Sequence, residues 1–116
     1  MFKVMSAFAL PEGTDPEEFW KYHTKIHAED VKKAAGPSLK KLKKYVVNRV
    51  TNVVEGDAKY FGIVEMWWDN AEALQEYVKV SRNYKTASGK SPMDDFLSRV
   101  KPVWSIEMEE ANISLS

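Results

Sequence analysis

This sequence of 116 residues contains no cysteine. Disulfide bonds, thiolate nucleophiles and cysteine-ligated metal sites are therefore excluded. The chain also lacks net charge, because 17 basic residues balance 17 acidic ones. Without a basic excess no field attracts phosphate backbones, so a nucleic acid is not an expected partner. The apolar segment 1–10 is too short to span a membrane and lacks the cleavage site of a secretory signal, so we expect a cytoplasmic protein without membrane association.

The residues that are present are typical of one folded domain. Hydrophobic residues make up 44% of the chain and charged residues 29%, which is the balance of an ordinary globular protein. A chain of this length can bury one core but leaves little room for a second. Because no repeat or linker divides it, we predict a single domain over residues 1–116.

Local periodicity predicts the order of helices and strands. Residues 2–9 are apolar and β-compatible, and a helix follows, with Asp15 as its cap and Pro16 in its first turn. Gly36 and Pro37 end that helix near Ala35. The later predictions are strands 42–54 and 59–68 joined by a turn at 55–58, a helix 70–82 capped by Asp69 with Glu72, a helical piece 93–100, and a last strand 102–110.

This order of elements, βαββαβ, predicts an α+β protein of the ferredoxin-like class. Two helices would cover one face of a four-stranded antiparallel sheet. Alternation along the third strand puts Ile63, Glu65 and Trp67 on one side and Val64 and Met66 on the other. Both sides are largely apolar, whereas a half-solvated sheet has a polar side. We therefore expect a homodimer in which a second subunit covers the face that the helices leave open.

The two histidines of the chain lie four residues apart in the first predicted helix. At roughly 100° per residue, a single stripe of this helix faces the sheet. Ionisable groups interrupt a stripe that should be apolar, and such departures concentrate at functional sites. A satisfied core histidine remains the alternative for either residue. The predicted stripe consists of Phe19, Trp20, His23, Ile26, His27, Asp30, Val31 and Ala34.

A metal site is a further interpretation of this spacing. His23 and His27 are separated as two helical ligands would be, with Asp30 as a possible third. The segment lacks the glutamate of the zinc-protease motif and the chain has no other histidine, so we predict no bound metal. Glu65 is a mid-strand carboxylate that must pair with a basic group or face a cavity, which makes it a second candidate.

The arrangement of these motifs resembles the EthD family of dimeric α+β barrel proteins. A capped helix carries Phe19, Tyr22 and the pair His27–Ala28, a strand contains Tyr45, and another reads "GIVEMWWD" from Gly62 to Asp69. The resemblance implies that His27 faces a pocket between helix and sheet, and that Glu65 and Trp67 match family positions. The chain departs from the family pattern where Glu29 and Asp30 replace proline and leucine, and where His23 replaces a common tryptophan.

The resemblance implies a small-molecule enzyme that uses no cofactor. Relatives act as isomerases, dehydratases or decarboxylases on lactones and aromatic polyketides, so we expect a lyase or isomerase acting on such a hydrophobic substrate. His27 would be the general base, with a pKa near neutrality, and Asp30 or Glu65 would orient its ring. His23 could serve as the partner acid. The aromatic pocket would be formed by Trp20, Tyr22, Tyr45 and Trp67.

Two other functions remain open at this point. The protein could be a non-catalytic accessory protein that holds a hydrophobic product of an oxidative degradation pathway. It could also be a monooxygenase of the same superfamily, either cofactor-free or haem-binding. The fold alone does not choose among these functions.

Overall fold

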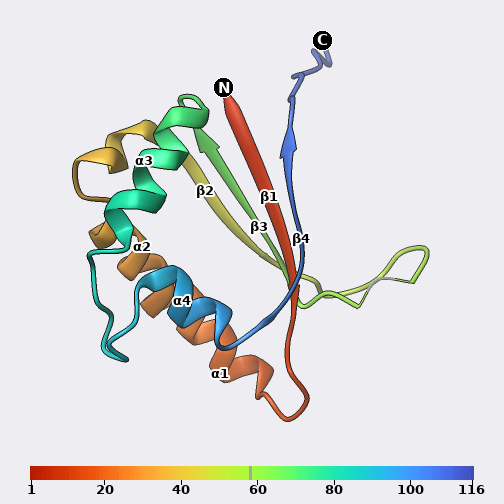
Figure 1. The fold of residues 1–116 in the computed structure, drawn as a ribbon. Coiled ribbons are helices and arrows are strands. Elements are labelled where there is room, and N and C mark those ends of the chain that lie inside the picture. The colour runs from red at the N-terminus through yellow and green to blue at the C-terminus, as the bar shows by residue number, and fades with distance from the viewer. Residues whose placement is uncertain (58) are drawn as a thin grey trace.

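The computed structural model describes residues 1–57 and 59–116. Figure 1 shows a sheet of four antiparallel strands with every labelled helix on one side of it. The strand order is β2-β3-β1-β4, which confirms the predicted ferredoxin-like plan. In chain order the elements are β1 (Phe2–Ala9), α1 (Pro16–Lys21), the π-helical turn η1 (Tyr22–His27), α2 (Ala28–Ala35), the 3₁₀ turn η2 (Gly36–Lys41), β2 (Leu42–Arg49), β3 (Gly62–Trp68), α3 (Ala71–Ser81), α4 (Pro92–Leu97) and β4 (Lys101–Met108).

The helical run from α1 to α2 begins and ends where the sequence predicts. The Asp15 carboxylate accepts hydrogen bonds from the backbone N–H groups of Glu17 and Glu18, and so satisfies two donors of the first turn. Gly36 follows the last turn with a φ of +53°, a conformation that favours glycine. Between these ends the run is not a regular α-helix, because it contains the π-helical turn η1.

The hairpin of β2 and β3 is shorter than predicted. Its strands end at Arg49 and resume at Gly62, so the described residues 50–57 and 59–61 belong to neither strand, where the sequence predicts strand on both sides of a tight turn. Val54, one of these residues, is 94% exposed. Strand propensity alone does not hold a segment that has no neighbouring surface to pack against. Residue 58 of the predicted turn lies outside the described residues.

The cap of α3 is also one residue away from its predicted position. Asn70, not Asp69, accepts a hydrogen bond from the N–H of Ala73 (2.9 Å). Asp69 instead forms an ion pair with Lys43 (3.5 Å). Both side chains are good caps, so the sequence could not separate them. The predicted helical piece 93–100 and strand 102–110 correspond to α4 and β4.

The core lies between the helices and the even-numbered positions of β1 and β3. Two buried clusters fill it, one centred on Phe8, Phe19 and Phe96, the other on Trp68 and Tyr77. Gly62 is required by close packing, because a Cβ atom there would lie 2.6 Å from the Phe8 ring. The glycine therefore lets this ring sit against the sheet beneath the helices.

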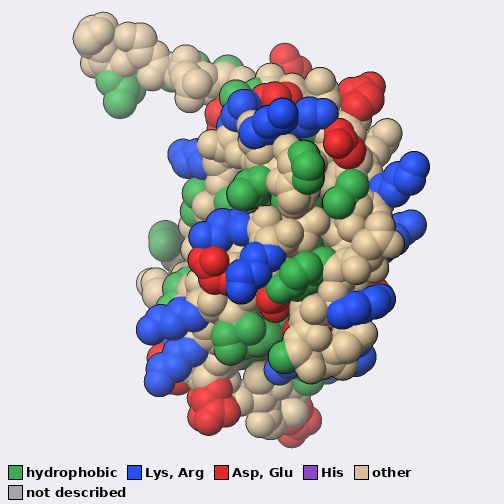
Figure 2. Space-filling view, turned by 90° about the vertical axis from the view of Figure 1, so that its left-hand side faces the viewer, with side chains coloured by type: hydrophobic (Ala, Val, Ile, Leu, Met, Phe, Trp, Pro, Cys, Tyr) green, Lys and Arg blue, Asp and Glu red, His purple; other side chains and the backbone are tan. Residues whose placement is uncertain are grey.

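The outer surface of the helices carries mixed charge. Figure 2 shows acidic and basic side chains interspersed with small apolar patches, and no histidine is visible on this face. Among the described residues, no helix is both long and apolar enough to cross a membrane.

Candidate functional site

A cavity of about 330 Å³ lies between the helices and the sheet. Its wall is formed mainly by apolar side chains from β1, β3, α2, α3, α4 and β4. Within the described part of the chain, no charged side chain lines it. The polar side chains of the lining are Ser6, His23, His27, Tyr45, Tyr77 and Ser105.

The π-helical turn places both histidines on the cavity side. In η1 the N–H of Ala28 donates to the carbonyl of His23, five residues earlier. Such a turn is wider than an α-helical turn, and π turns occur frequently at functional sites. The two imidazole rings are consequently close, with centroids 5.5 Å apart. The wider turn also shifts the helical phase, so Ile26, predicted to face the sheet, is 56% exposed.

Aromatic rings surround the two imidazoles. Phe96 of α4 stacks on His27 at a centroid distance of 4.5 Å and lies 4.8 Å from the ring of His23. Phe8 and Phe19 approach the His23 ring at 5.4 and 5.8 Å. His23 is fully buried and His27 is 7% exposed. Both rings therefore sit in a low-dielectric environment.

The ring nitrogens of these histidines have no hydrogen-bond partner among the described residues. Both nitrogens of His23 and Nδ1 of His27 are buried and unsatisfied. Buried polar atoms are nearly always paired, so these atoms, like the buried indole nitrogen of Trp68, are open to a ligand or to ordered water. The chemistry of the site begins with these three nitrogens.

Burial keeps both histidines neutral. Burial, together with the neighbouring His27, lowers the pKa of His23 to about 3. Burial likewise lowers the pKa of His27 to about 4, with Asp95 acting to raise it and Arg99 to lower it. This value is well below the near-neutral pKa predicted for a general base at this position. The sequence could not supply the correction, because it does not show how deeply the ring is buried.

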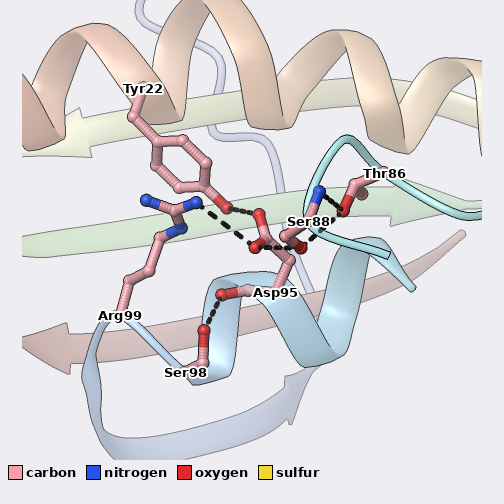
Figure 3. Close-up of polar contacts among 6 residues, drawn as sticks. All are labelled: Tyr22, Thr86, Ser88, Asp95, Ser98 and Arg99. Carbon is pink, nitrogen blue, oxygen red and sulfur yellow. Dashed lines mark hydrogen bonds and ion pairs between the residues drawn. The ribbon is translucent and has the colours of Figure 1, made fainter. Parts of the chain in front are cut away.

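A buried carboxylate that the sequence prediction missed lies beside the histidines. Figure 3 shows Asp95 of α4 between Tyr22, Ser88 and Arg99. The hydroxyl of Tyr22 donates to Oδ2 of Asp95 (2.5 Å), and Ser88 donates to Oδ1 (2.8 Å). Arg99 donates to the same Oδ1 atom (3.3 Å). The spacing of Asp95 and Arg99, four apart in a predicted helical piece, was the one sequence signal that could have pointed to this carboxylate.

The residues predicted around His27 are only partly assembled there. Tyr45 lines the cavity, and the Tyr22 ring lies 6.0 Å from the His27 ring. Trp20 and Asp30 are half-buried and do not line the cavity. In the described residues no hydrogen bond joins Asp30 to the His27 ring, whose Nδ1 is buried without a partner, so a role for Asp30 in orienting this ring stays a prediction. Asp30 follows the π turn, whose shifted phase leaves it at the border of the buried stripe.

Glu65 and Trp67 lie on the opposite face of the sheet from the histidines. In the register of β1 and β3, Glu65 pairs with Met5, whereas Met66 and Val64 point to the cavity. Glu65 accepts a hydrogen bond from Asn48 (2.9 Å) and forms an ion pair with Lys3 (3.1 Å). The structure therefore does not bring Glu65 to His27, because strand alternation puts adjacent positions on different faces.

Trp67 is held on that same face by charged neighbours. The ammonium groups of Lys3 and Lys44 lie 4.5 and 4.8 Å from its ring centroid. Its indole N–H donates to Glu110 (3.1 Å). Trp67 consequently does not contribute to the histidine cavity, contrary to the predicted aromatic pocket.

The histidine pair is not completed to a metal site. Over residues 1–57 and 59–116, no three His, Asp or Glu side chains are grouped so that they could hold a metal ion. Asp30, the third ligand considered from the sequence, is not drawn into such a group.

Comparisons with known proteins agree with this fold. No curated protein matches the chain. An EthD family protein from Bacillus halodurans is 23% identical, with a TM-score of 0.64 over 96% of this chain and 99% of its own. HapK from Hahella chejuensis is 13% identical, with a TM-score of 0.66 over 100% and 98%. SnoaB, a cofactor-independent oxygenase from Streptomyces nogalater, is 12% identical, with a TM-score of 0.56 over 98% and 95%.

These likenesses establish the fold, and a family model establishes the relationship. The model of the EthD domain matches residues 11–86, which include α1, η1, α2, the β2–β3 pair and α3. The matched segment contains both histidines and Tyr45. The chain belongs to the EthD family.

Proposed function

We propose that the protein binds a small neutral apolar molecule in the cavity and removes an acidic C–H or O–H proton from it with His27. The product would be released after isomerisation or after loss of a leaving group, so the reaction is that of a cofactor-independent isomerase or lyase. The observation that carries this proposal is the set of unpaired imidazole nitrogens in a cavity that is largely apolar and has no charged side chain among the described residues of its lining. A ligand with a proton to give satisfies them best.

In the proposed proton transfer one bond breaks and one bond forms. The substrate C–H or O–H bond breaks, an N–H bond forms on the imidazole of His27, and the electron pair stays on the substrate. An isomerase returns the proton to another atom, whereas in a lyase the electron pair expels a leaving group. A neutral imidazole with a pKa of about 4 is a weak base toward water. The anion formed beside it stabilises the imidazolium, because charges attract strongly where water is excluded.

The other polar groups of the lining would serve this chemistry as donors. His23, neutral and buried, can present an N–H to the oxygen on which negative charge develops. Burial raises the pKa of Tyr77 to about 12, so its hydroxyl stays protonated. Tyr45 has its pKa raised by burial in the same way. Its ring also contributes to the apolar wall.

A binding protein without catalysis is the second candidate. Two observations favour it: the lining has no charged side chain in the described residues, and both histidines are weak bases. Such a cavity would hold a neutral product for a partner enzyme. An oxygenase is a further possibility, since oxygenation without a cofactor can also begin with proton removal, but the likeness to SnoaB carries the fold alone.

Hydrogen–deuterium exchange of 2-tetralone in D₂O, followed by NMR, tests the proposal without knowledge of the natural substrate. This neutral aromatic ketone has an acidic C–H beside its carbonyl. We expect the protein to accelerate exchange above the buffer rate, and His27→Ala to reduce that acceleration by roughly a hundredfold or more. His23→Phe should cost less, because it removes only a donor.

Other outcomes separate the alternatives. Tight binding of the ketone without exchange would favour the binding protein. Consumption of dissolved oxygen would favour the oxygenase, and an unchanged Soret band after adding haem would exclude its haem-dependent form. Equal exchange by wild type and His27→Ala, both folded, would remove His27 as the base.

A further inference from the structure

Asp95 is a buried carboxylate that has no role in the proton abstraction by His27 as described so far. It is 4% exposed, and burying a carboxylate is costly unless donors surround it. Its three donors come from separate segments: Tyr22 from η1, Ser88 from the loop before α4, and Arg99 from the residues after it. Burial by itself would raise the pKa of Asp95, but these hydrogen bonds outweigh it and the pKa is lowered. A negative charge is thus held in the protein interior, behind the residues that line the cavity.

This charge is positioned next to the base. Phe96, the residue after Asp95, stacks on the His27 ring at 4.5 Å. Tyr22, which donates to Asp95, lies 6.0 Å from the same ring. Both neighbours of the carboxylate therefore contact His27, although Nδ1 of that ring has no hydrogen-bond partner among the described residues. Asp95 acts on the ring through space and through its packing.

The charged and titratable groups around His27 come from several elements. Asp95 raises the pKa of His27 and Arg99 lowers it. Asp95 is almost fully buried, whereas the Arg99 side chain is 46% exposed and its charge is better screened by water. The other titratable groups around His27 are Tyr22 and His23 of η1 and, across the cavity, Tyr45 of β2 and Tyr77 of α3.

We propose that Asp95 is a positioning residue for His27, an inference that rests on the proposed role of His27 as base. Its carboxylate ties α4 to the π turn through Tyr22, which sets Phe96 against the imidazole, and its charge stabilises the imidazolium after proton transfer. A direct hydrogen bond would hold His27 more strongly in the charged form. The indirect arrangement leaves the ring neutral and free to accept a proton, yet favours the charge once it has formed.

The test is an NMR titration of the two histidine rings, assigned with the His23→Phe variant. Asp95→Asn keeps one oxygen that can accept from Tyr22 or from Ser88, replaces the other with an amide NH2 that can donate to the remaining hydroxyl, and removes the charge, so the pKa of His27 should fall. Arg99→Gln removes the opposing charge at a partly exposed position, so the pKa should rise. Asp94→Asn removes an exposed carboxylate from the same helix and is the matched control, expected to leave the titration unchanged.

If Asp95 had only a structural role, the pKa of His27 would not be expected to shift in opposite directions in Asp95→Asn and Arg99→Gln. If Asp95→Asn does not fold, the rise in Arg99→Gln still tests the electrostatic part. An unchanged His27 pKa in both folded variants, or equal shifts in all three, would overturn the proposal. The exchange assay separates this result from the proposed function. If His27→Ala loses activity but the pKa shifts are absent, only the positioning role of Asp95 is refuted. If the pKa shifts are present but His27→Ala stays active, only the role of His27 as the base is refuted.

Discussion

The polar side chains at the cavity and those on the open face of the sheet differ in how they are paired. On the face covered by helices, three imidazole nitrogens are buried and have no partner in the described structure. On the other face Glu65 has both Asn48 and Lys3, and the indole of Trp67 has Glu110. A polar group that is paired within the chain needs no further partner, whereas an unpaired buried group is open to a ligand or to ordered water. The difference therefore separates a candidate site from a structural network more clearly than residue type does.

Because the two histidines are buried in the neutral form, the free energy of unfolding should decrease as the pH falls. In the unfolded chain His23 and His27 bind protons near pH 6.5, whereas in the fold their pKa values are about 3 and about 4. The unfolded state thus binds more protons as pH falls from 6.5, so stability is lost over that range and down to the folded pKa values. At pH 5 we expect a loss of about 2 kcal/mol per histidine relative to pH 7.

Urea unfolding at several pH values measures this loss. His23→Phe should remove about half of the pH dependence, because one of the two titrating rings is gone. The lowered pKa values of Glu65 and Asp95 contribute stability that disappears only at lower pH, so they do not confuse the comparison above pH 5. A free energy of unfolding that is flat between pH 7 and pH 5 would contradict the buried, neutral state of the histidines.

We expect the dimer interface to be the open face of the sheet, which the helices do not cover. Its apolar side chains include Met5, Val46 and Ile63, all half-buried, and Ile106, which is 44% exposed. We expect a homodimer that buries about 1,600 Å². Ile63→Glu places a charge on this face and should weaken association by roughly a hundredfold or more, as expected for a charge desolvated without a partner.

Light scattering with matched variants tests this expectation. Val54→Glu adds the same charge to a fully exposed position of the β2–β3 connection and should remain dimeric. Val64 lies on the cavity side, so Val64→Glu should reduce folding in place of association. A wild-type monomer at micromolar concentration would show that the open face has no second copy on it.

The sequence could predict the elements and the histidine face, but not the pairing of polar groups. Capping residues and periodicity located β1 and the helical run 16–35 because those signals are local. The π turn, which aligns His23 with His27, has no comparable signal. The role of Asp95 depends on a contact with Tyr22 across 73 residues, which no spacing rule reveals. Glu65 and His27 looked alike as polar interruptions of apolar patterns, and only tertiary structure shows that Lys3 and Asn48 already satisfy the carboxylate.

Replacing Glu65 on the open face should have the smallest effect on activity. Glu65→Gln changes the carboxylate of the open face, keeps an acceptor for Asn48, and leaves the cavity lining untouched. The substitution removes the ion pair with Lys3 but changes nothing in the cavity lining, so we expect 2-tetralone exchange within about twofold of wild type. The His27→Ala variant, measured in parallel, shows that the assay can detect a large loss. If Glu65→Gln instead lost activity to a similar extent with its fold and dimer intact, the two faces would belong to one site. Glu65 would then return to the catalytic role that its place in the strand first suggested.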